Sequence, residues 1–168
     1  RTELYKLRRK FMSHADGLTH ADLHTSNIMA SRDKMKVIDM EFAFMGPFGY
    51  DLGYLVGNLI SQYCAACFKR FPSEQSRKQF KAYLLATIKS LIETYMKTFT
   101  LCWEKSVKER YRGQQGLLQS ILQEVMEDVP GYASMVNWFR SVSEIPYPDF
   151  DIIEDKDVKR NATVLSLM

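Results

Sequence analysis

The chain has 168 residues, of which 46% are hydrophobic and 26% charged, and its formal net charge is +3. This length suits one domain with a sizeable core, and the composition excludes a disordered polypeptide. The 23 basic and 20 acidic side chains are too evenly balanced to indicate a nucleic-acid-binding protein, which concentrates its basic residues in a stripe. No apolar run reaches the roughly 18 residues that a membrane span requires, and we find no secretory signal pattern.

The cysteines favour a reducing compartment. Cys64 and Cys67 form a CxxC, but no further ligands at suitable spacing complete a zinc site. Both lie on one face of an expected helix, where buried thiols that take part in packing are the simplest interpretation. We therefore expect a cytoplasmic protein.

The first fifty residues predict one helix and one small hairpin. Apolar residues at helical spacing predict a helix over 2–13, which Gly17 would terminate. Two short strands are expected at 27–30 and 35–39, paired around a polar turn. Two glycines and a proline in "MGPFGYD" predict a loop over 45–51.

Helices are expected from there onward. Asp51 is placed as the N-cap of a helix that reaches about Phe68, and Ser73 as the N-cap of the next helix. That next helix spans about 74–109, a length at which a break is possible.

The C-terminal third predicts shorter helices. The Pro-Gly pair at 130 separates a helix over 117–128 from another over 132–144. Prolines favour an extended segment over 145–151, and a last helix with an acidic first turn covers 154–167. The prediction is a mainly α fold with a small β-hairpin, in a single domain.

Polar groups are concentrated around this hairpin. In "HADLHTSNI", Asp22 is followed five residues later by Asn27, and Asp39 and Glu41 come after one strand and a turn. A hairpin brings its flanking loops together, so we expect these side chains to converge. Carboxylates crowded in one cleft repel one another unless a cation lies among them, and hard oxygen ligands of this kind suit Mg²⁺.

This set of groups matches phosphoryl transfer. A carboxylate that is not bound to the metal can accept the proton of a substrate hydroxyl, while an asparagine and an aspartate hold Mg²⁺ against the phosphates of ATP. The spacing H-x-D-x-x-x-x-N, followed by a hydrophobic strand that ends in aspartate, is typical of the catalytic and metal loops of the kinase fold.

The segments "HADLHTSNI" and "VIDMEFAFMGPFGYDLG" resemble the aminoglycoside phosphotransferase and choline kinase-like group. Within it they are most similar to the S-methyl-5-thioribose kinases, through the pattern "EFAF-GP-G-D-G". The resemblance is strong over 18–60 and weaker as far as about 153–155. It implies that residues 1–168 form the C-terminal lobe of a protein-kinase-like α+β fold. The Gly-rich loop and strand lysine of the N-terminal, nucleotide-binding lobe are absent from this chain.

The resemblance implies a role for each acidic or amide side chain of the two loops. Asp22 would orient and deprotonate the acceptor hydroxyl. Asp39 and Glu41 would bind the Mg²⁺ that bridges the ATP phosphates, and Asn27 would hold a second metal ion.

Other residues would support the catalytic loop. By the same resemblance Asp51 would brace its backbone from below, and we expect His20 and His24 to organise it by hydrogen bonds. Ala21 stands where the family usually has glycine, which matters if the backbone needs a positive φ there.

The resemblance implies transfer of the γ-phosphoryl group of ATP to the anomeric hydroxyl of S-methyl-5-thioribose, in methionine salvage, by an enzyme that forms a homodimer. Phe139–Arg140 aligns with a twin-arginine pair associated with the substrate, so Arg140 is either a substrate contact or a salt-bridged helix residue. The alternatives are a kinase of the same group acting on choline, an aminoglycoside or another sugar, and a catalytically silent remnant that serves as a binding domain. The fragment alone is expected to turn over little or not at all.

Overall fold

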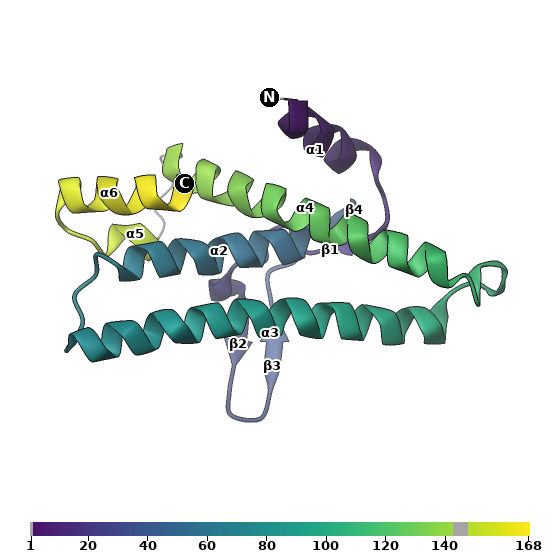
Figure 1. Cartoon of the computed structure of the whole chain (residues 1–168), viewed down its shortest axis with the longest axis horizontal. Helices are drawn as coiled ribbons and strands as arrows, with labels where there is room; N and C mark the ends of the chain where they lie inside the picture. Colours follow the sequence, from purple (N-terminus) through teal and green to yellow (C-terminus); the bar gives the residue numbers. More distant parts are fainter. Residues whose placement is uncertain (1, 143–147) are drawn as a thin grey trace.

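The computed structural model describes residues 2–142 and 148–168 (Figure 1). It is mostly helical, with four short strands paired into two small antiparallel sheets. The described elements are α1 (Thr2–Ser13), β1 (Gly17–Thr19), η1 (Thr25–Asn27), β2 (Ile28–Ala30), β3 (Met35–Val37), β4 (Phe44–Gly46), α2 (Tyr50–Ala66), α3 (Glu74–Ser106), η2 (Glu109–Tyr111), α4 (Gln115–Val142), α5 (Pro148–Asp151) and α6 (Lys156–Leu167).

Helix α2 is the centre of the fold. Figure 1 shows it between α3 and α4, while α5 and α6 cover its C-terminal end and the β2–β3 hairpin projects past α3. Two glycines permit the close approach of α4. A Cβ atom added to Gly53 would lie 2.6 Å from the Cβ atom of Tyr132, and one added to Gly57 would lie 2.7 Å from the carbonyl oxygen of Ala133.

Two apolar clusters bury the faces of α2. The larger one joins α2 to α4 and receives side chains from α3; its buried members are Leu52, Val56, Val125, Val129 and Ala133. The smaller one fastens the C-terminal helices and contains Ala65, Phe150, Ile153 and Ala162. Because both clusters include residues of α2, this helix is fixed in the fold, and segments that pack on its remaining face have a fixed surface to contact.

The predicted hairpin is confirmed. Strands β2 and β3 pair antiparallel, with Ile28 opposite Val37 and Ala30 opposite Met35. A second pair, β1 with β4, was not predicted, because Gly17 was interpreted as a breaker and 45–51 as a loop. Gly17 instead starts β1, opposite Gly46 of β4, and the ring of Phe48 occupies the space that a side chain at residue 17 would need.

The long helices differ from prediction in one respect. The helices over 2–13 and from residue 74 are confirmed, and Ser73 caps the latter by accepting a hydrogen bond from the amide of Ser76 at 3.0 Å. The break at Pro130 is wrong, since α4 continues through it. Proline removes one helical hydrogen bond, but buried side chains on both sides of it, Val129 and Tyr132 among them, hold α4 against α2.

The C-terminal region is more helical than predicted. Part of the expected helix 132–144 and of the expected extended segment 145–151 lies on residues 143–147, outside the described residues. The remainder, Pro148–Asp151, is helical rather than extended, since proline is compatible with the first turn of a helix. Asp155 caps α6 by accepting hydrogen bonds from the amides of Asp157 and Val158 at 2.9 and 3.0 Å.

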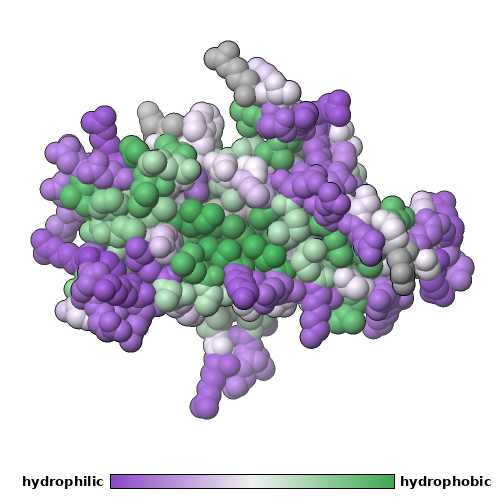
Figure 2. All heavy atoms as spheres, viewed as in Figure 1, coloured by the Kyte–Doolittle hydropathy of each residue, from purple (hydrophilic) through white to green (hydrophobic). Residues whose placement is uncertain are grey.

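The surface of the face seen in Figure 2 is uneven in polarity. Hydrophobic side chains gather in its middle, over α2 and α3, while the projecting tip of the β2–β3 hairpin is hydrophilic. None of the helices in the described part of the chain combines the length and apolar character that crossing a bilayer requires.

Candidate functional site

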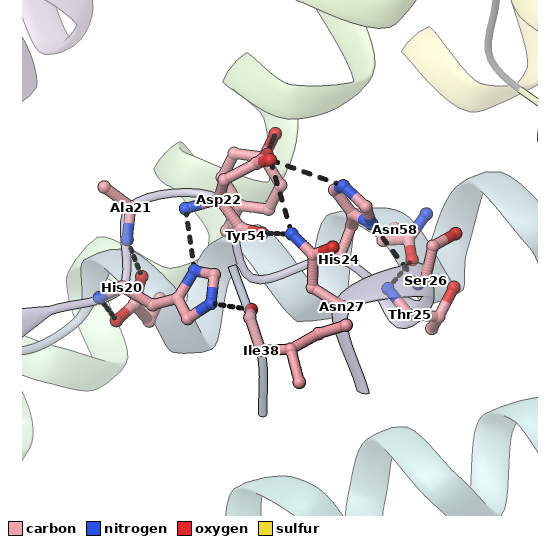
Figure 3. Close-up of polar contacts among 11 residues, drawn as sticks. His20, Ala21, Asp22, His24, Thr25, Ser26, Asn27, Ile38, Tyr54 and Asn58 are labelled. Carbon is pink, nitrogen blue, oxygen red and sulfur yellow. Dashed lines mark hydrogen bonds and ion pairs between the residues drawn. The ribbon is translucent and has the colours of Figure 1, made fainter. Parts of the chain in front are cut away.

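The segment from His20 to Asn27 lies against one face of α2 and forms the candidate catalytic loop (Figure 3). It joins β1 to the β2–β3 hairpin, so one end is fixed by the β1–β4 pair and the other by the hairpin. His20 and Asn27 are buried, at 5% and 7% exposure, whereas the residues between them are half-buried or exposed. The loop thus presents its central side chains to solvent from two anchored ends.

Asp51 holds the start of this loop. It was predicted as the N-cap of α2, which is wrong, because the capping position is Gly49 and no side chain caps the helix there. The Asp51 carboxylate instead accepts hydrogen bonds from the backbone amides of His20 at 2.6 Å and Ala21 at 2.9 Å. The support of the catalytic loop by Asp51, which the family resemblance implies, stays a prediction.

Ala21 adopts a positive φ of 69°. An L-residue is disfavoured in this left-handed region and glycine is not. The two hydrogen bonds to Asp51 come from the amide of Ala21 and the amide before it, so Asp51 fixes the backbone that enters this strained position.

The carboxylate of Asp22 is the most heavily contacted group of the loop. Its Oδ1 atom accepts a hydrogen bond from the hydroxyl of Tyr54 at 2.8 Å. Its Oδ2 atom has only longer contacts, 3.4 Å to His24 Nε2 and 3.5 Å to Asn27 Nδ2. Asn27 Nδ2 also donates to the backbone oxygen of Asp22 at 3.0 Å. The carboxylate is therefore oriented, and one of its oxygens is held less tightly than the other.

Both histidines contact the loop backbone. His20 Nε2 lies 2.8 Å from the carbonyl oxygen of Ile38, and His20 Nδ1 accepts from the amide of Asp22 at 3.3 Å. The Nδ1 atom of His24 accepts from the amide of Ser26 at 3.2 Å. Each ring therefore has a backbone partner, and the expected role of His20 and His24 in organising the loop stays a prediction.

Four polar residues of α2 contact the loop in register. Asp51, Tyr54, Asn58 and Gln62 are spaced three, four and four residues apart, so they lie on one face of the helix. We call this set the α2 polar stripe. Asn58 Oδ1 accepts from the amide of Thr25 at 2.9 Å, and Gln62 Nε2 donates to Thr25 Oγ1 at 3.0 Å. The stripe and the loop run in the same direction, from Asp51 at His20 and Ala21 to Asn58 and Gln62, which both contact Thr25.

Arg140 lies beneath this stripe rather than at the surface. Its side chain is 3% exposed and forms an ion pair with Asp149, which accepts a hydrogen bond from Asn58 Nδ2 at 2.8 Å. Burial raises the pKa of the Asp149 carboxyl, and the positive charges of Arg140 and Lys69 oppose that rise. Of the two interpretations of Arg140, the salt-bridged helix residue matches this placement, and its role as a substrate contact stays a prediction.

Tyr50, at the start of α2, is a half-buried neighbour of this site whose pKa is raised. Burial, together with the negative charges of Asp51 and Asp22, raises the pKa of Tyr50 to about 12. Its ring lies 5.0 Å from that of Phe11 and 5.1 Å from that of Tyr132, which joins α1 and α4 to the start of α2.

The candidate metal ligands are arranged across the hairpin. The backbone oxygen of Asn27 accepts from the amide of Ile38 at 3.0 Å, which puts Asp39 one residue beyond this bridge. Asp39 and Glu41 are exposed, and Glu41 lies within a turn that runs from Met40 to Ala43. No three His, Cys, Asp or Glu side chains of the described residues gather closely enough to hold a metal ion, so the expected convergence of Asp22, Asp39 and Glu41 is not seen.

These residues nevertheless fit Mg²⁺ bound together with a nucleotide. Both amide hydrogens of Asn27 are directed at Asp22, so its Oδ1 atom is the end of the side chain that can accept a cation. Carboxylate and amide oxygens are suitable ligands, and Mg²⁺ sites commonly take one or two protein ligands and complete their shell with phosphate oxygens and water. The assignment of Asn27, Asp39 and Glu41 as ligands stays a prediction.

The sequence analysis missed Tyr54, Asn58 and Gln62. The signal was present, because the polar side chains of an otherwise apolar helix recur on a single face. It becomes specific only when the partner is known to be the loop, whose contacted residues lie 32 to 37 positions earlier in the chain.

Known proteins similar to this chain are phosphotransferases, in agreement with the kinase motifs of the sequence. The phosphotransferase enzyme family matches residues 2–91. The chain is 36% identical over 155 residues to the methylthioribose kinase of Geobacillus thermodenitrificans, an alignment that covers 92% of this chain and 37% of that enzyme. It is 32% identical over 157 residues to the methylthioribose kinase of Exiguobacterium sibiricum, covering 94% and 38%, and 30% identical over 153 residues to that of Pectobacterium atrosepticum, covering 91% and 38%.

The chain thus spans little more than a third of the length of these curated relatives. The family match covers more than half of the chain and includes the whole catalytic loop, the hairpin and the α2 polar stripe. The chain belongs to the phosphotransferase enzyme family.

Proposed function

We propose that this chain is the C-terminal lobe of an ATP-dependent kinase that phosphorylates S-methyl-5-thioribose at its anomeric hydroxyl. The observation that carries the reaction class is the oriented carboxylate of Asp22, with Oδ1 bound by Tyr54 and Oδ2 less tightly held. The acceptor is suggested by the three relatives, each named methylthioribose kinase.

In the proposed reaction, Asp22 Oδ2 accepts the proton of the acceptor hydroxyl. The acceptor oxygen forms a bond to the γ-phosphorus of ATP, and the bond from that phosphorus to the oxygen it shares with the β-phosphate breaks. ADP leaves with this oxygen, and the acceptor leaves as its 1-phosphate. Positioning and electrostatic stabilisation account for most of the rate in such transfers.

Asn27 Oδ1 and the carboxylates of Asp39 and Glu41 would hold Mg²⁺. The bound ion would neutralise negative charge on the ATP phosphates. The hydrogen bond between the Asn27 carbonyl and the Ile38 amide keeps the two sides of this site in register. The nucleotide would also need the Gly-rich loop and lysine of an N-terminal lobe, which is consistent with the extra length of the relatives.

The test is acceptor-dependent release of ADP by the full-length gene product with Mg-ATP. The panel contains S-methyl-5-thioribose, a ribose without the methylthio group, choline and an aminoglycoside. We expect release with S-methyl-5-thioribose. Choline or an aminoglycoside as the sole acceptor would keep the reaction class and overturn the substrate. These compounds belong in the panel because Phe139 stands in place of one of the twin arginines that the resemblance implies, and the remaining one, Arg140, is buried.

A further inference from the structure

Among the four residues of the α2 polar stripe, Tyr54 contacts the carboxylate of Asp22, the proposed catalytic base. The other three members bind backbone amides or the Thr25 hydroxyl. The hydroxyl of Tyr54 donates a hydrogen bond to Asp22 Oδ1 at 2.8 Å. Figure 3 shows the two side chains next to each other.

The two oxygens of Asp22 are held differently. The Oδ1 atom receives a short hydrogen bond from a hydroxyl, and hydrogen bonds to an ionised acceptor are stronger than those between neutral groups. The Oδ2 atom lies 3.4 Å from His24 Nε2 and 3.5 Å from Asn27 Nδ2, at the limit of hydrogen-bond distance. The carboxylate is thus fixed through Oδ1 while Oδ2 can still accept a proton.

The position of the Tyr54 hydroxyl is itself well determined. The residue is in the second turn of α2, between the buried Leu52 and Leu55, and its ring lies 6.1 Å from that of Tyr50. A tyrosine ring has only two side-chain torsions, so a packed ring puts its hydroxyl at a defined point. The side chain of Asp22 lies on a loop and is 27% exposed, so its orientation depends on contacts of this kind.

We propose that Tyr54 is a positioning residue for the base: its hydroxyl anchors Asp22 Oδ1 and so presents Oδ2 to the acceptor hydroxyl. This inference rests on the proposed function. It adds a role for α2 in the chemical step, beyond its support of the loop backbone.

The test compares Tyr54→Phe with Tyr95→Phe in the full-length protein. Tyr95 is a matched control, because its hydroxyl donates to the carbonyl oxygen of Phe48 at 2.9 Å, away from Asp22. Each variant loses a tyrosine hydroxyl together with the hydrogen bond that it donates, to Asp22 or to Phe48, and keeps the ring. We expect Tyr54→Phe to lower kcat about 10- to 100-fold with the KM values for ATP and acceptor within about twofold, as for an interaction made in the transition state. Tyr95→Phe should keep kcat.

A double-mutant cycle gives the second measurement. If Tyr54 acts through Asp22, adding Tyr54→Phe to Asp22→Asn should not reduce the residual rate further, so the two effects are strongly non-additive. Tyr54→Leu, which also lacks the donor, takes the place of Tyr54→Phe in the cycle if the latter does not fold.

The outcomes are distinct. Suppose that the wild-type protein is active on an acceptor. If Tyr54→Phe then keeps the wild-type kcat, or if the effects in the cycle are additive, the positioning role alone is overturned. Wild-type protein without activity on any acceptor would overturn the proposed function, and this inference with it.

Discussion

Asn58 and Asp149 are joined by a hydrogen bond of 2.8 Å across 91 residues of sequence. The same Asn58 side chain accepts from the Thr25 amide at 2.9 Å, so it connects the candidate catalytic loop to the buried Arg140–Asp149 ion pair. The C-terminal helices thereby contribute to the geometry of a loop that is formed more than a hundred residues earlier.

Substitution of Asn58 should affect both stability and turnover. Asn58→Ala removes partners from a backbone amide and from the half-buried carboxylate of Asp149, and we expect it to lower the free energy of unfolding by about 2 kcal/mol. Urea unfolding of the full-length protein measures this. Ser61→Ala is the matched control, since Ser61 is one turn along α2 and donates to Asn137 Oδ1 at 2.6 Å without touching the loop. It should cost stability but keep kcat, and an equal loss of kcat in both variants would refute the connection.

Ala21→Gly should stabilise the protein. The positive φ of 69° disfavours alanine and suits glycine, so we expect a gain of about 1 kcal/mol in the free energy of unfolding. Ala30→Gly in β2 is the comparison, where the added backbone freedom should cost about 0.5–1 kcal/mol. A destabilising Ala21→Gly would show that the loop does not need this backbone conformation.

The helix packing behind the site can be tested at Gly57. A methyl group there would lie 2.7 Å from the carbonyl oxygen of Ala133 and 3.0 Å from its Cα atom, so Gly57→Ala must push α2 and α4 apart. We expect a loss of about 2 kcal/mol in the free energy of unfolding, measured by urea denaturation. Gly116→Ala has open space around the new methyl group and should be neutral or mildly stabilising. Equal effects of the two substitutions would contradict the close helix contact.

Asp39→Asn should abolish Mg²⁺-dependent nucleotide binding by the full-length protein. Asp39 has a φ of 67°, and asparagine tolerates this region, so the substitution removes charge without imposing a new backbone conformation. Asp33→Asn, at the exposed tip of the same hairpin, is the matched control and should leave binding unchanged. Calorimetric titration with Mg-ADP distinguishes them, and normal binding by Asp39→Asn would remove this residue from the metal site.

Buried tyrosines predict loss of stability at alkaline pH. Burial, followed by the negative charge of Asp51, raises the pKa of Tyr95 from 10.0 to about 12, so the folded state favours its neutral form. This contribution to stability is complete below pH 10.0 and is lost as the pH rises to about 12. Unfolding measured across this window should show a steeper loss for wild type than for Tyr95→Phe, and identical slopes would contradict the burial effect.

Local pattern was enough to predict the hairpin, the first helix and the long helix that Ser73 caps. Spacing alone also marked Asp22, Asn27, Asp39 and Glu41 as residues of interest, because the kinase loops are short contiguous motifs. The structure agrees with the elements, whereas the roles of these four residues stay predictions.

Features that depend on tertiary contact were not predictable. Pro130 was expected to end a helix, but packing of Val129 and Tyr132 against α2 outweighs the lost hydrogen bond. Gly17 was expected to break structure, but the Phe48 ring fills the space beside it and a strand forms. Asp51 has the sequence position of a helix cap, and only the arrival of the loop makes its carboxylate a partner of His20 and Ala21.

The most direct test of the account is the effect of Asp22→Asn on the full-length protein. The quantities to measure are Mg-ADP affinity and ADP release with Mg-ATP and S-methyl-5-thioribose. We expect unchanged affinity and a rate lower by about 1,000-fold, because the substitution removes the proton acceptor and leaves the nucleotide contacts in place. A near-normal rate in the variant would contradict the role of Asp22, and a folded wild-type protein that phosphorylates no acceptor would favour a binding domain without catalysis.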